Sequence, residues 1–461
     1  MATSAPLDPR TVSGARTRLA WLPRWIVAGL LIRLLLMPLH HPWDLQTWYN
    51  MFVDLARDHS PYATFHDLTA SYRADQGLLE PREVPSAAAQ ETFYAYYAYP
   101  PLLMMLYYPL AKIADQVIPL EYQFTIHGPA AQAVVPPLFH LFFKLPLFLA
   151  ELGIAALLWR LAGEGGARRF FLNPLVILVS ATWTVEALMA LGVILSIYLL
   201  RRERYLASAV ALAAGTLIKF LPGVLMPAVL LYLWHRGVPR RTIVAYAATF
   251  LAICAAVVAP FWTGFREVLL FQLVRPGANL SVHLVLYPLN QFTRLDIRYL
   301  ANVVSPLIGV ITQTAALVLV YAYLARRVHS LTQTCVITLI AFLLGSKVVN
   351  EPYLYVLVPL LALELGEHPS EAKEVMYKLL YALPLAFAFV NVPIVYIAAP
   401  FYRYFWKGSY PVSYDWARAF PLEWHAVLLI GLAFSFIVAC AYSIVVIARE
   451  GTHAEVSAAA Y

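Results

Sequence analysis

The sequence predicts an all-α, multi-pass membrane protein with about twelve transmembrane helices and further surface helices on its external side. Two observations support this fold class. Of the 461 residues, 61% are hydrophobic and 13% are charged, whereas about a quarter of the residues of a soluble domain are charged. The apolar residues also fall in repeated blocks, long enough to cross a hydrocarbon layer of about 30 Å. The composition therefore excludes a soluble globular domain.

The chain begins with a short basic segment. Arginines precede or open the first apolar block, residues 21–39, at Arg10, Arg16, Arg18 and Arg24. The positive-inside rule assigns such a segment to the cytosol. We therefore expect a cytosolic tail at 1–20, one transmembrane domain at 21–448 and a second cytosolic tail at 449–461. The net charge of +7 then reflects topology signals and headgroup anchors, and it implies no nucleic-acid partner.

Residues 40–137 are expected to form an external loop that carries amphipathic surface helices. On a helical wheel, the polar residues that follow the first span share one side: Thr47, Asn50, Asp54, Arg57 and Asp58. A helix of this kind lies in the membrane surface with its polar side in water. Further along, the uninterrupted apolar stretch 101–111 is too short to span, so we expect an interfacial or re-entrant helix there.

The remaining spans follow from the other apolar blocks. They are expected near 138–160, 242–261, 301–325, 332–349, 352–366, 376–398 and 426–448. A second external loop is expected at 262–300. Residues 171–200 and 205–235 are expected to form two tight hairpins, although about 15 residues per arm reach only about 22 Å. A single long span in each of these regions is the alternative interpretation.

Asp44 is the candidate catalytic residue of the external loop. A carboxylate at the outer membrane face can act as a general base for a hydroxyl nucleophile. The neighbouring Trp43 can stack on a sugar and raise the pKa of that carboxylate. Asp44 also follows Pro42, and aspartate is a good helix N-cap, so capping is an alternative that does not exclude catalysis.

Charged side chains inside apolar blocks are costly and need a partner or a polar cavity. Five stand out: Lys144, Glu151, Glu186, Lys219 and Lys347. Lysine side chains near the external face can bind the phosphate of a lipid carrier, or they can snorkel to the surface. Together with Arg275, the lysines Lys219 and Lys347 are the candidate phosphate-binding residues. Candidate sugar- or acceptor-binding residues are Trp43, Asp54, Tyr99, His283, Asn350, Glu351 and Tyr353.

Several classes of site are not indicated by the sequence. No nucleotide-phosphate loop, dinucleotide fingerprint, zinc-ligand spacing or serine elbow occurs. The three cysteines each lie alone in an apolar block, which predicts neither a disulfide framework nor a cysteine metal site. We predict no cofactor, and the use of a divalent metal stays open.

The order of six motifs resembles membrane glycosyltransferases of the GT-C type that use polyprenyl-phosphate sugars, in particular the mannosyltransferases of glycosylphosphatidylinositol (GPI) assembly. The motifs are WDLQTWYNMFVDLARDHSPY, YAYPPLLMMLYYPLA, KLPLFLAELGIAALL, FLNPLVILVSATWTVEALMAL, LIKFLPGVLMPAVLL and KVVNEPYLYVLVPLL. One departure concerns the base. The GPI branch has two aspartates separated by one residue, whereas this chain has Trp43, Asp44, Leu45 and Gln46.

The resemblance implies an inverting glycosyl transfer at the outer membrane face, with Asp44 as the general base. The expected donor is a polyprenyl- or dolichyl-phosphate sugar with mannose as the sugar. The expected acceptor is a lipid-linked or extracellular glycan. Two other functions stay open from the residues alone, a secondary transporter and a non-catalytic binder of polyprenyl lipids.

Overall fold

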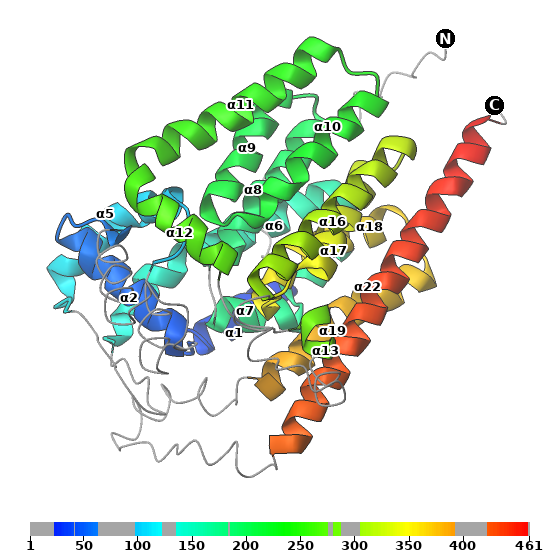
Figure 1. Cartoon of the computed structure of the whole chain (residues 1–461). Coiled ribbons are helices and arrows are strands. Elements are labelled where there is room, and N and C mark those ends of the chain that lie inside the picture. Colours follow the sequence, from blue (N-terminus) through cyan, green and yellow to red (C-terminus); the bar gives the residue numbers. More distant parts are fainter. Residues whose placement is uncertain are drawn as a thin grey trace.

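The computed structural model describes residues 23–40, 42–62, 97–121, 135–182, 185–274, 280–286, 305–391 and 422–459. All regular elements in these ranges are helices, which confirms the all-α fold class. They form a tilted bundle, in which α11 (Arg240–Val258) lies along one edge and α22 (Leu422–Ala459) along the opposite one (Figure 1).

The helices of the first half are α1 (Arg24–Leu35), α2 (Pro42–Ala56), α5 (Pro101–Val117), α6 (Pro137–Phe171), α7 (Pro174–Thr182), α8 (Glu186–Arg201) and α9 (Tyr205–Ile218). After α9 come η2 (Leu221–Val224), α10 (Leu225–His235), α11, η3 (Ala259–Phe261), α12 (Trp262–Val274) and α13 (Val282–Leu286). The last elements are α16 (Ser305–Arg326), α17 (Leu331–Gly345), η5 (Glu351–Val356), α18 (Leu357–Glu367), α19 (Glu371–Asn391) and α22.

Within the described part of the chain, 4 helices are long and apolar enough to cross a membrane. They cover Pro137–Phe171, Arg240–Leu270, Gly309–Arg326 and Val427–Arg449. These correspond to the spans predicted at 138–160, 242–261, 301–325 and 426–448. Because the other helices are shorter or more polar, the expected number of about twelve spans is not shown. The chain is thus an all-α membrane protein.

Helix α2 does not have the water-facing side that its sequence predicts. Thr47, Asn50 and Asp54 are buried, and the Asp54 side chain is only 3% exposed. Helix α5 packs along α2, and on the apolar side of α2 Phe52 packs with its ring centroid 5.0 Å from that of Phe139 in α6. The polar side of α2 therefore lies inside the protein, and only its C-terminal end reaches the surface.

That end is fastened to α5 by Asp58. Its carboxylate pairs with Lys112 Nζ at 2.7 Å and accepts a hydrogen bond from the Tyr108 hydroxyl, also at 2.7 Å. The hydrogen bond from Lys112 lowers the pKa of the Asp58 carboxyl below its usual range. Asp58 is exposed, as the sequence predicts for a residue on the solvated side.

The predicted hairpins 171–200 and 205–235 do not pack as expected. Helix α7 ends at Thr182 and α9 ends at Ile218, and a separate helix follows each of them, so neither region is one continuous helix. However, α8 packs along α9 and α6 rather than along α7, and α10 packs against α16 and α17. The close pairing of α8 and α9 depends on glycine. A Cβ atom on Gly192 would lie 2.7 Å from the Gly215 Cα atom of α9.

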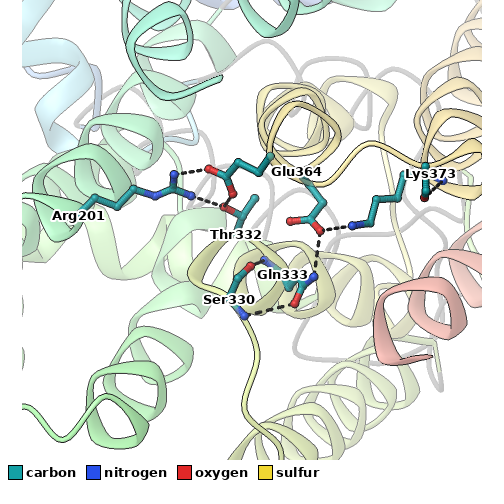
Figure 2. A network of polar contacts seen from close by, with 8 residues as sticks. Arg201, Ser330, Thr332, Gln333, Glu364 and Lys373 are labelled. Atoms are coloured by element: carbon teal, nitrogen blue, oxygen red, sulfur yellow. Dashed lines mark hydrogen bonds and ion pairs between the residues drawn. The ribbon is translucent and has the colours of Figure 1, made fainter. Parts of the chain in front are cut away.

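A polar network ties the ends of α8, α17, α18 and α19 together (Figure 2). In one part, Arg201 at the end of α8 pairs with Glu367 of α18. In the other, Lys373 of α19 pairs with Glu364 of α18 at 2.8 Å, and both side chains are fully buried. Gln333 in the first turn of α17 donates a hydrogen bond of 3.0 Å to the same carboxylate. Four helix ends are therefore linked by charged groups.

Candidate functional site

The candidate site lies where interrupted helices meet. Helix α8 begins at Glu186, and α9 ends at Ile218, followed by its C-cap residue Lys219, whose extended backbone leads into η2. A third interruption follows α17, where the chain is extended as far as Asn350 and then enters η5. Proline stands early in both 3-10 helices, at Pro222 and Pro352, where its fixed φ angle favours the start of a new helix. The breaks are thus encoded locally.

An ion pair between Lys219 and Glu186 occupies this junction. The Lys219 ammonium group also lies 4.6 Å from the ring centroid of Tyr353 and 5.8 Å from that of Tyr99. The Lys219 side chain is 13% exposed and that of Glu186 is 3% exposed. Glu186 Oε2 has no hydrogen-bond partner within the described ranges. The lysine is therefore a partly desolvated cation, compensated by one carboxylate and two aromatic rings.

A second ion pair joins α1 to α6. Arg33 of α1 pairs with Glu151 of α6, with side-chain exposures of 1% and 0%. The other oxygen of Glu151 accepts a hydrogen bond of 2.8 Å from the Tyr355 hydroxyl of η5. The Arg33 guanidinium carbon also lies 4.1 Å from the ring centroid of Phe171. Since Tyr353 and Tyr355 both belong to η5, this short helix contacts both buried ion pairs.

Lys144 is a third buried cation, and its role is to cap backbone groups. Its ammonium group donates to the carbonyl oxygens of Met37, Leu39 and Ala181 at 2.7, 2.5 and 2.7 Å. All three ammonium protons are therefore used. This lysine holds the end of α7 against the segment between α1 and α2. The expectation that these intramembrane charges need partners is thus confirmed for Lys144, Glu151, Glu186 and Lys219.

The structure brings three of the predicted site residues together, namely Lys219, Tyr99 and Tyr353. Asp44 lies in the first turn of α2 and is half-buried. Trp48, one helical turn later, has its ring centroid 4.7 Å from that of Tyr99. Asp44 is therefore one helical turn from Trp48, whose ring contacts Tyr99 of the junction.

The other predicted residues are more scattered. Lys347 is buried. Its side chain packs on Gly309, where an added Cβ atom would lie only 2.6 Å from the Lys347 Cδ atom. Asn350 caps η5, and buried Glu351 accepts a hydrogen bond of 3.3 Å from Asn391. Buried Asp54 belongs to α2. Arg275 and the side chains of Trp43 and His283 lie outside the described residues.

The predicted phosphate-binding residue Lys219 has a carboxylate partner. Lys219 is neutralised by Glu186, so its charge is already compensated without a bound anion. In the described ranges, no group of three or more histidine, cysteine, aspartate or glutamate side chains can hold a metal ion. The sequence analysis also missed Arg33. The signal was present, since Arg33 is a single charged residue within the first apolar block and such residues need partners.

One segment of the chain matches the model of a known protein family. Residues 164–265 match the model of the family described as GPI transamidase subunit PIG-U. The segment is less than half of the chain, and it runs from the last turns of α6 into α12. It includes both members of the ion pair between Glu186 and Lys219. No curated protein matches the chain.

This match corrects the expected function. The family is described as a transamidase subunit, whereas the motif order predicts a glycosyltransferase that uses dolichyl-phosphate mannose. The prediction of mannosyl transfer from a dolichyl-phosphate sugar is therefore wrong. Asp44 lies outside the matched residues, so its role as a base stays a prediction. The match favours neither a secondary transporter nor a binder of polyprenyl lipids. What it retains of the resemblance is the link to membrane proteins of the GPI pathway.

Proposed function

We propose that this chain is a membrane-embedded subunit of a GPI transamidase type of complex. The observation that carries the proposal is the family match over residues 164–265. That segment forms α7 to α11, which include the close α8–α9 pair and the junction residues Glu186 and Lys219. Its resemblance to a subunit suggests that the chain acts together with other proteins.

The chemistry of the junction is consistent with a structural contribution to such a complex. Lys219 is compensated by Glu186, Arg33 by Glu151, and Lys144 by three backbone carbonyl groups. Each of these charges joins two or more interrupted helices. The buried ionic groups therefore stabilise the arrangement of the bundle, and catalysis in the complex falls to a partner subunit.

The test is carried out in membranes of the cells that naturally produce the protein. A transamidase replaces one amide bond by another, so a small nucleophile such as a biotin-linked hydrazide can substitute for the natural amine. We expect deletion of the chain to abolish transfer of a reporter protein to the hydrazide. Re-expression of the wild-type chain should restore it.

A second measurement separates assembly from indirect effects. In a mild detergent, the tagged chain should migrate well above its own mass of 51.6 kDa, and transfer activity should migrate with it. The Lys378→Met variant, which changes an exposed side chain, is the control for re-expression. It should migrate and restore transfer as the wild-type chain does. A chain that migrates alone, with transfer unaffected by its deletion, would refute the proposal.

A further inference from the structure

Three arginine side chains gather around Tyr198 at one end of α8. Arg160 of α6 and Arg204 both lie near enough to the Tyr198 hydroxyl group to act on it electrostatically. The Arg202 guanidinium carbon lies 5.4 Å from the centroid of the Tyr198 ring. All three arginines are exposed. Guanidinium groups from two separate elements thus converge on one hydroxyl group.

These arginines are not paired with carboxylates, which distinguishes them from their neighbours. Arg201 pairs with Glu367, and Arg169 lies 3.6 Å from Glu374. No such ion pair is found for Arg160, Arg202 or Arg204 among the described residues.

Two carboxylates lie nearby in the sequence, and they leave the arginines in excess. Glu164 of α6 already accepts a hydrogen bond of 2.8 Å from the Trp25 indole. Glu203 lies between Arg202 and Arg204, in the turn that joins α8 to α9, and has a φ of 57°. Arg160, Arg202 and Arg204 together outnumber Glu203, so the cluster carries a net positive charge, which attracts an anion.

The start of α9 adds hydrogen-bond donors at the same turn. Arg204 is the N-cap residue and makes no side-chain capping hydrogen bond, and the first turn contains no acidic residue. The first helical hydrogen bond there runs from the Ser208 amide to the Arg204 carbonyl oxygen, at 3.0 Å. The amide groups of Arg202, Glu203 and Arg204 donate to carbonyl groups at the end of α8, so those of residues 205–207 in the first turn of α9 are left for another acceptor. A helix N-terminus with arginine beside it favours phosphate.

The position of the cluster indicates where the phosphate comes from. Helix α6 is long and apolar enough to span a membrane, and Arg160 precedes its break at Gly163, where φ is 70°. The cluster therefore lies at the end of a spanning segment, at the level where lipid headgroups are found. We propose that Arg160, Arg202 and Arg204 form a binding site for the phosphate group of an anionic lipid.

Titration of the purified protein with phosphatidic acid tests this site. Thermal stability in dodecyl maltoside reports binding, with phosphatidylcholine as the neutral lipid and inorganic phosphate as the soluble anion. We expect stabilisation by phosphatidic acid alone. The triple variant R160Q/R202Q/R204Q should bind phosphatidic acid at least about tenfold more weakly, since one lost charge-assisted hydrogen bond already has this effect.

A matched variant separates a specific site from general positive charge. R236Q/R240Q/R241Q removes three exposed arginines at the end of α10 and the start of α11, and it should bind phosphatidic acid as wild type does. Equal losses in both triple variants, or none in the first, would overturn the site. Equal stabilisation by inorganic phosphate would overturn the lipid assignment. If the triple variant does not fold, R202Q alone should still weaken binding severalfold, and unchanged binding would refute the proposal.

Discussion

The buried pair of Lys373 and Glu364 offers the sharpest test of how charge stabilises this bundle. Both side chains are 0% exposed and their charged atoms are 2.8 Å apart. Lys373→Met would leave the Glu364 carboxylate with only the hydrogen bond from Gln333 among the contacts described above. Removing one member of a buried pair costs about 3–5 kcal/mol.

The double variant Lys373→Met/Glu364→Gln removes the second charge as well and keeps an acceptor for Gln333. We expect its stability to lie within about 1 kcal/mol of wild type, because replacing both partners of a buried pair is often neutral. Because Lys373→Met alone costs about 3–5 kcal/mol, adding Glu364→Gln should restore at least about 2 kcal/mol, so the two substitutions should be strongly non-additive. Unfolding in dodecyl maltoside with increasing sodium dodecyl sulfate, followed by tryptophan fluorescence, measures these free energies.

The exposed pair of Lys378 and Glu374 provides the control. Its atoms are 3.4 Å apart, and its side chains are 61% and 35% exposed. Lys378→Met should lower stability by less than about 0.5 kcal/mol, since exposed pairs one turn apart contribute little. If Lys373→Met were as mild as Lys378→Met, or if the two substitutions of the buried pair were additive, the reasoning about buried charge would be wrong.

Two further predictions concern packing and pH. Gly192→Ala should destabilise the protein by about 1–3 kcal/mol, because its Cβ atom would lie 2.7 Å from the Gly215 backbone. In the same unfolding assay Gly431→Ala, with nothing within 4 Å of the new atom, should be neutral or slightly stabilising. Asp58→Asn should lower the melting temperature slightly at pH 7 and leave it unchanged at pH 2. The lowered pKa of Asp58 means that its bond to Lys112 stabilises the fold above the unfolded pKa and is lost as pH falls through the folded pKa. A melting-temperature difference that persists at pH 2 would contradict this assignment.

The fold class was predictable because it depends on composition and block length, which are local properties. Which helices pack against one another was not predictable from these local properties. The polar side of α2 carries Asp54, which a helical wheel assigns to water, yet this residue is buried inside the protein. The hairpins failed for a similar reason. Gly192 and Gly215 allow α8 and α9 to approach each other closely, and this preference outweighs the spacing of the apolar blocks.

The candidate site was predictable only in part. The rule that buried charges need partners correctly singled out Glu186 and Lys219, but not that they pair with each other across 33 residues of sequence. The same rule applied to the first apolar block would have found Arg33. The activity was not predictable from motif order, because a shared order of motifs reports common ancestry or architecture, and chemistry depends on the site.

The short helix η5 has a mechanical consequence for the bundle. Tyr353 touches the cation of one ion pair and Tyr355 donates to the carboxylate of the other. In a 3-10 helix, two residues apart means about 4 Å along the axis. A rotation of η5 would disturb both contacts in one step, so α1 with α6 and α8 with α9 cannot rearrange independently. Any signal from a neighbouring molecule that turns η5 would reach both halves of the bundle at once.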